Sequence, residues 1–191
     1  MKKTIRTVII VIVFAAIILG YYYYLSHRNV SNQDKVEKET DIEMIINTNL
    51  NLDYPKTPRE VIKLYNKMLK CYYNDNPSEV EIKDLVLQQR ELLDDELKEN
   101  NPEAQMVQNT RNDISNAKDN GRTIVSSTVC SSNEIVYKTI DDRECAYVTS
   151  GYFIKNKDGY EKTTQKYVLR KDENGKWKII VYYLVETPRE E

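Results

Sequence analysis

Few side chains in this sequence have the types and spacing that catalysis or metal binding requires. The chain contains one histidine, His27, and three cysteines without a CxxC pair, so the common zinc-ligand patterns are missing. It has no nucleophile motif and no glycine-rich phosphate loop, and the acidic stretches "NKDG" and "DENG" are typical of hairpin turns rather than calcium loops. We therefore expect no catalytic residue, no metal and no cofactor, and we expect that the protein is not an enzyme.

The aspartates Asp94 and Asp95 and the tyrosines are the remaining candidates for chemistry. An aspartate can act as a general base, and a tyrosine hydroxyl can donate a hydrogen bond to a developing oxyanion. Carboxylates in a helical stretch such as "ELLDDELKE" are, however, more commonly part of a solvated face. Aromatic residues in core-forming positions are expected mainly to pack in the core and only secondarily to line a pocket. The candidate pocket-lining residues are Tyr65, Tyr72, Tyr167, Trp177 and Tyr183.

The cysteines Cys71, Cys130 and Cys145 allow two interpretations. They are either three small buried hydrophobic residues, or one free thiol together with a Cys130–Cys145 disulfide between neighbouring strands. The odd number favours the first interpretation, because a disulfide framework in an exported protein normally uses an even number.

Composition and charge describe one folded domain of ordinary size. The chain has 191 residues, of which 40% are hydrophobic and 30% are charged, far from the composition of disordered segments. The formal net charge is -2, and the basic residues do not gather into a patch outside the first few positions. Because a nucleic-acid-binding protein normally presents a basic face, we expect no nucleic-acid partner.

An apolar run near the start predicts a membrane span. It extends from Val8 to Leu19 without interruption, and with the residues through Leu25 it would reach about 27 Å at 1.5 Å per residue. Four aromatic residues cover the next helical turn, where rings with a polar tip favour the outer interface of the membrane. These candidate interface residues are Tyr21, Tyr22, Tyr23 and Tyr24.

The same run can be interpreted as a retained anchor or as a cleaved signal peptide. Cleavage after Gly20 or Ser26 would place a large residue, Ile18 or Tyr24, at the -3 position, which favours retention. Basic residues are more numerous before the run than just after it, so the N-terminus is expected in the cytoplasm. We expect an uncleaved signal anchor in residues 1–25 of a single-pass cell-membrane protein with an extracytoplasmic C-terminal domain.

Sequence patterns divide the remainder into a spacer and a domain. Residues 26–51 are polar and predict a spacer, although residues 41–55 are also compatible with a short docked helix or strand. Residues 52–191 predict the domain. Thr57 and Glu60 form a capping box around Pro58, which predicts a helix to about residue 74. The pairs 76–77 and 101–102, each Asn-Pro, predict two more helix starts, and Gly121 ends the third helix.

After Gly121 the hydrophobic period changes to two, which predicts antiparallel strands. Strand-like segments cover residues 122–132, 134–140, 143–155, 160–171 and 177–186, and Asp/Asn-Gly turns separate the later ones. Gly151 inside a strand indicates a bulge. In the last segment the odd-numbered residues from 177 to 185 should share one face. The expected fold is α+β: a transmembrane helix, then three helices packed on a curved four-stranded antiparallel sheet.

The order of elements and the closing "YVLRKDENGKWKIIVYYLV" resemble the nuclear-transport-factor-two-like cone, the cystatin-like fold of SnoaL-like cyclases and ketosteroid isomerases. More narrowly, "YPKTPREVIKLYNKMLKCYYN", "ELLDDEL" and "RECAYV" resemble an uncharacterised bacterial family of small membrane-anchored proteins. The cone resemblance implies a sheet wrapped around the first helix, with a pocket in which related enzymes use an aspartate base, an Asp–His pair or a tyrosine-lined oxyanion site. The single histidine, His27, lies next to the expected membrane span, so the chain departs from the pattern of related enzymes that use a histidine in the pocket.

Two functions follow as expectations. The first is a membrane-tethered interaction or scaffold module that forms a homodimer or binds a partner in a membrane complex. This expectation rests on analogy with a type IV secretion scaffold subunit, which joins one membrane helix to an exported cone. The alternative is a pocket protein that binds a small ligand or acts as a hydrolase or isomerase. It predicts a cavity lined by tyrosines and Trp177, with a buried carboxylate directed into it.

Overall fold

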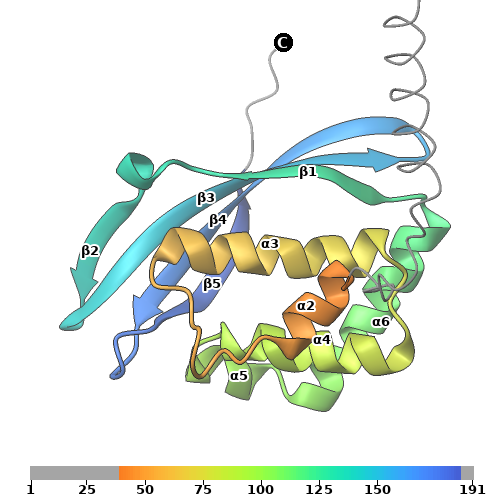
Figure 1. Ribbon diagram of the computed structural model, residues 1–191. Helices are drawn as coiled ribbons and strands as arrows, with labels where there is room; N and C mark the ends of the chain where they lie inside the picture. The colour runs from red at the N-terminus through yellow and green to blue at the C-terminus, as the bar shows by residue number, and fades with distance from the viewer. Residues whose placement is uncertain (1–38, 186–191) are drawn as a thin grey trace, which may run out of the picture. The chain divides into compact units, whose positions relative to one another are not determined.

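The computed structural model describes residues 39–185, and all of its α-helices precede the strands (Figure 1). The helices are α2 (Asp41–Asn47), α3 (Pro58–Asn74), α4 (Glu79–Glu91), α5 (Asp95–Asn100) and α6 (Glu103–Asp119). Capping boxes begin α2, α3 and α4, because in each a Thr or Ser side chain and the Glu three residues later bind otherwise unpaired backbone N–H groups. The expected start of α3 at Thr57, with Pro58 in the first position, is confirmed.

The second expected helix is interrupted by contact with the sheet. Its N-cap is Ser78 rather than Asn76, whose φ of 49° lies in the left-handed region. It ends at Glu91, because the following backbone pairs with a strand: Ile179 N–H donates to the Leu92 oxygen at 2.8 Å. The N–H of Asp94 in turn donates to the Ile179 oxygen at 2.9 Å. Helix α5 then begins as a separate element.

The sheet contains five strands, all paired antiparallel. They are β1 (Thr123–Val129), β2 (Val136–Ile140), β3 (Arg143–Asn156), β4 (Gly159–Lys171) and β5 (Trp177–Val185). The order is β1-β3-β4-β5, and β2 also pairs with β3. Because β2 pairs with residues 143–147 of β3 and β1 pairs with residues 150–155, the two strands follow each other along β3. A short 3-10 helix, η1 (Ser132–Glu134), connects them.

The structure is α+β, but the expected architecture of three helices on four strands is wrong. Five strands replace four because β1 and β2 share one position beside β3, and five α-helices replace three in residues 39–185 because α2 is helical and the second helix is broken. A membrane-spanning helix was also expected, whereas no helix of the described residues is long and apolar enough to cross a bilayer. The expected anchor, residues 1–25, and its interface tyrosines Tyr21 to Tyr24 lie outside the described residues.

Helix α3 is the centre of the core. It packs against the sheet on one side and against α2, α4 and α6 on the other (Figure 1). Its residues Val61, Ile62 and Met68 are fully buried, as are Val148 and Leu169 of the sheet. Ile42, Ile45 and Leu50, from the stretch assigned to the spacer, are buried in the same core. The three cysteines are free thiols, and Cys71 and Cys145 are buried.

A β-bulge changes which residues of β5 face the helices. Leu169 of β4 pairs with Ile179 while Val168 pairs with Val181, so Ile180 is an extra residue in β5. The expected single face of odd-numbered residues is therefore wrong: beyond Ile180 the alternation is shifted, and the even-numbered Tyr182 pairs with Tyr167. The bulge expected at Gly151 is also wrong, because Gly151 pairs in regular register with both neighbouring strands.

Candidate functional site

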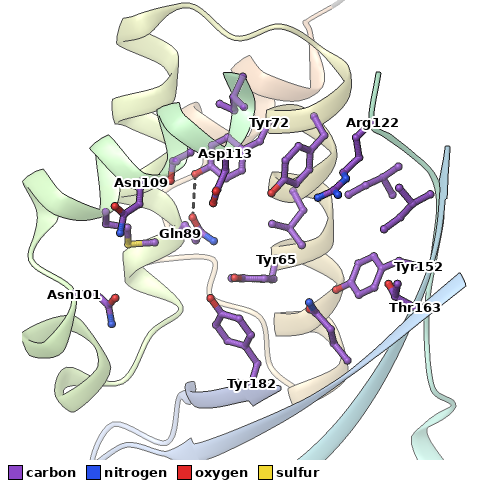
Figure 2. A pocket seen from close by; sticks show the side chains of 18 of the residues that line it. Tyr65, Tyr72, Gln89, Asn101, Asn109, Asp113, Arg122, Tyr152, Thr163 and Tyr182 are labelled. Carbon is purple, nitrogen blue, oxygen red and sulfur yellow. Dashed lines mark hydrogen bonds between the residues drawn. The ribbon is translucent and has the colours of Figure 1, made fainter. Parts of the chain in front are cut away.

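A pocket of about 380 Å³ lies between the helices and the inner face of the sheet (Figure 2). One wall is a stripe of α3 at helical spacing, formed by Tyr65, Leu69, Tyr72 and Tyr73. Residues of α4, α5 and α6 form the opposite wall, and β1, β3, β4 and β5 contribute the rest. The pocket exists because α6 packs mainly on α3 and α4, which leaves space between its inner face and the sheet.

The buried polar part of the lining is called the pocket floor and consists of Tyr65, Tyr72, Gln89 and Tyr152, each no more than 5% exposed. The Tyr72 hydroxyl donates to Gln89 Oε1 at 3.0 Å, which joins α3 to α4. The rings of Tyr65 and Tyr182 lie 6.2 Å apart between centroids, and Figure 2 shows their side chains turned toward each other. Helix–helix and helix–sheet contacts therefore hold the floor in place.

A second hydrogen-bond chain fixes Tyr152 on the sheet side. Its hydroxyl donates to Asn66 Oδ1 at 2.5 Å and lies 2.6 Å from the hydroxyl of Tyr167. Tyr167 donates in turn to Gln165 Oε1 at 2.5 Å, and the Asn66 amide donates to Ser150 Oγ at 2.9 Å. Asn66, Tyr152 and Tyr167 of this hydrogen-bond network are buried between α3, β3 and β4, so removal of one of them leaves another buried polar group without its partner.

The tyrosines of the floor are neutral hydrogen-bonding groups. Burial raises the pKa of Tyr65 and Tyr72 well above the ordinary value, and it also raises the pKa of Tyr152. The adjacent hydroxyl of Tyr182 raises the pKa of Tyr65 further. A phenol with a raised pKa donates or accepts a hydrogen bond at neutral pH but does not ionise there. The floor is thus polar and uncharged.

Two charged residues stand at the solvent side of the pocket, here called the rim, together with Asn109. Asp113 comes from α6, and Arg122 lies directly before β1; both are exposed, and both side chains extend toward the pocket in Figure 2. No ion pair joins Asp113 or Arg122 to another residue in the part of the chain that the structure describes. Both act on one phenol: burial raises the pKa of Tyr73, Asp113 raises it further and Arg122 lowers it.

The structure separates the five aromatic residues selected from the sequence. Tyr65 and Tyr72 line the pocket. Tyr167 is fully buried behind the lining, where its ring centroid lies 5.6 Å from that of Tyr65. Trp177 packs in another part of the core, 5.8 Å from the ring of Tyr137, and Tyr183 is not part of the lining. Tyr182 takes the position beside the pocket that the strand pattern assigned to Tyr183.

The aspartates that were candidates for a general base have structural partners. Asp94 is buried, accepts from Arg170 Nη2 at 2.6 Å, and also accepts from the backbone N–H of Glu96 at the start of α5. Asp95 is exposed and lies 3.3 Å from the ammonium group of Lys98. Neither aspartate lines the pocket. Gln89, Tyr152, Tyr182 and the charges of the rim line the pocket but were not among the residues expected from the sequence.

The missed residues had weak sequence signals. Tyr152 and Ile154 follow the strand alternation, and Thr110, Asp113 and Ile114 share one helical face, which marks a polar interruption of an apolar stripe.

Within residues 39–185, no cluster of three or more histidine, cysteine or acidic side chains could hold a metal ion.

A comparison with protein-family models finds a match that covers most of the chain. A family model described as a domain of unknown function (DUF6715) matches residues 1–182. The search of curated proteins finds no match to the chain. The pocket therefore has to be interpreted from its own geometry.

Proposed function

We propose that this chain, which belongs to the DUF6715 family of domains of unknown function, binds a small amphipathic organic molecule in its pocket without transforming it. The observation that carries the proposal is the preformed pocket with a neutral hydrogen-bonding floor. Its volume of about 380 Å³ lies in the range of about 300–1,000 Å³ that small-molecule sites occupy.

The walls supply the apolar part of the recognition. Leucine, isoleucine and methionine side chains of the helices and strands surround the tyrosine rings; they are Leu69, Leu93, Leu97, Met106, Ile114, Ile124 and Ile154. Such walls favour a ligand body that leaves water, whereas the hydroxyl and amide groups of the floor orient its polar end. The volume is at the lower end of the typical range, which favours a molecule with a single ring or short chain over a lipid or an oligomer.

The ionisation of the lining supports binding rather than catalysis. A general base works best when its pKa lies near the working pH. The buried phenols of the floor have raised pKa values, and Asp113 and Arg122, the formally charged residues among those that line the pocket in the described chain, stand at the exposed rim. The pocket alternative was expected to have Trp177 and a buried carboxylate in its lining, and neither is among these lining residues. The lining therefore offers hydrogen bonds to a bound molecule but no buried carboxylate as a general base. The other expected role, that of a membrane-tethered interaction module, stays a prediction.

A pocket-filling substitution tests the proposal. A fragment library containing ring compounds is screened against the full-length protein by ligand-observed NMR. Thr110 lines the pocket from α6, so Thr110→Trp should remove the binding of the hits. Gln108→Trp adds the same ring at an exposed position of α6 and should keep it. Thr163→Trp fills the pocket from β4 as a second variant. Hits that bind equally to all variants, or an absence of hits, would refute the proposal.

A further inference from the structure

The rim carries a feature of the pocket that the proposed function does not use: two opposite charges that form no ion pair with each other. Asp113 lies on the same face of α6 as Asn109 and Thr110, one turn further along the helix. Arg122 belongs to the connection between α6 and β1. The two charges therefore come from different elements but border the same opening (Figure 2).

The backbone holds both rim positions in place. The N–H of Arg122 donates to the Ala117 oxygen at 2.8 Å, which closes the last turn of α6. Two bonds of 2.9 Å tie the next residues to α3, because the Asn74 side chain both donates to the Ile124 oxygen and accepts from its N–H. The Lys157 N–H donates to the Asn120 oxygen at 3.0 Å and thereby fixes the end of α6 to the β3–β4 turn. The backbone spacing of the two charges is thus set by the fold.

Neighbouring charges do not replace the missing partner. Arg111, the next basic residue on α6, has its Nε atom 2.6 Å from Glu79 Oε2 and is directed to α4. The phenol of Tyr73, whose pKa Asp113 raises and Arg122 lowers, is kept neutral by burial, which raises its pKa most. The rim thus presents one anionic and one cationic group around a neutral hydroxyl, next to an apolar interior.

We propose that the pocket selects a small zwitterion of the α-amino acid type with an apolar or aromatic side chain. This inference rests on the proposed function. Asp113 would pair with the ammonium group and Arg122 with the carboxylate, while the side chain enters between the walls toward the tyrosines of the floor. A ligand with a single charge would pair with one rim residue and leave the other partly desolvated and unpaired. A neutral ligand would leave both rim residues partly desolvated and unpaired.

Four related probes isolate the charges of the ligand. L-Phenylalanine carries both charges, 3-phenylpropionate only the carboxylate, phenethylamine only the ammonium group, and 3-phenylpropanol neither. Titrations of the full-length protein, followed by ligand-observed NMR, should give the strongest binding for L-phenylalanine. An exposed ion pair contributes about two- to fivefold in affinity, so we expect about tenfold between L-phenylalanine and 3-phenylpropanol.

Charge-removing variants connect this preference to the rim. Asp113→Asn and Arg122→Gln should each weaken L-phenylalanine binding by about two- to fivefold. Asp113→Asn should affect phenethylamine but not 3-phenylpropionate, and Arg122→Gln the reverse. The exposed residues Asp119 and Arg143 do not line the pocket, and Asp119→Asn and Arg143→Gln serve as matched controls without effect.

The outcomes distinguish this inference from the proposed function. Equal affinities for the four probes that are lost in Thr110→Trp would overturn the zwitterion while the binding function stands. An unchanged L-phenylalanine affinity in both rim variants would also overturn the zwitterion and leave the binding function standing. The same conclusion would follow if library hits bind in the pocket but none of the four probes does. A failure of every compound to respond to Thr110→Trp would overturn both. The charge preference together with its loss in the rim variants would support both.

Discussion

Replacement of Asp94 tests whether this aspartate is a structural anchor between the helices and the sheet. It is 7% exposed and accepts from Arg170 of β4 through two atoms, Nη2 at 2.6 Å and Nε at 3.2 Å. It also caps α5 by accepting from the Glu96 N–H at 3.2 Å. One carboxylate therefore stabilises both a helix start and a largely buried ion pair, and two substitutions can separate these roles.

Asp94→Asn removes the charge but keeps a side-chain oxygen that can cap α5. Breaking a fully buried ion pair costs about 3–5 kcal/mol. We expect about 2 kcal/mol here, because the Arg170 side chain is 17% exposed and keeps Glu96 at 3.0 Å as a second partner. Asp94→Ala also removes the cap, which should lower the free energy of unfolding by about 1 kcal/mol more.

Urea denaturation of the full-length protein measures these differences, with the fluorescence of the buried Trp177 and far-UV circular dichroism as probes. Asp95→Asn is the matched control, since the pair of Asp95 with Lys98 is exposed and should contribute less than about 0.5 kcal/mol. A double-mutant cycle with Arg170→Gln isolates the coupling. An Asp94→Asn variant as stable as the wild type, or an equal loss of unfolding free energy in Asp95→Asn, would refute the anchoring role of Asp94.

Two further predictions concern the buried tyrosines. Tyr152→Phe should lower the free energy of unfolding by about 1–3 kcal/mol, because the buried Asn66 oxygen loses its donor at 2.5 Å. The exposed Tyr160→Phe should change it by less than about 0.5 kcal/mol, and equal effects in urea denaturation would contradict the network. Since burial raises the pKa of Tyr65 and Tyr72, the folded state keeps protons that the unfolded state releases near pH 10, and stability should fall as the pH rises above about 10. Urea midpoints between about pH 8 and about pH 11 measure this fall, which should be smaller in Tyr72→Phe; an equal fall would contradict the buried phenol.

Local chemistry was predictable from the sequence wherever a few adjacent residues decide the structure. The start of α3 follows from Thr57, Pro58 and Glu60, which bind or omit backbone N–H groups within one turn. The turn at Gly121 follows in the same way, since its φ of 59° suits a residue without a side chain.

Features that depend on distant pairing were not predictable. The break between α4 and α5 arises because Leu92 and Asp94 bond to Ile179, far away in the sequence. The extra residue Ile180 shows itself only through its pairing with β4, and one such residue exchanges the faces of Tyr182 and Tyr183. Local propensity carries no information about either.

The candidate site was predictable only in part for the same reason. Tyr65 and Tyr72 share a helix face, and periodicity selects them. The floor also needs Gln89 from α4 and Tyr152 from β3, which meet α3 only in the folded chain. The rim charges come from α6 and from the residue before β1, and their arrangement depends on how the chain passes from α6 into β1.

The division of one edge of β3 between two strands has a consequence for how the domain can vary. The half paired with β1 carries Tyr152 and Ile154 into the pocket, whereas all five residues of β2, on the other half, are exposed. Few buried apolar contacts mean a low local cost of opening. The end of the sheet at β2 can therefore fray, change its residues or lengthen its hairpin while the binding half keeps its shape, so that evolution can alter the two halves of this edge separately.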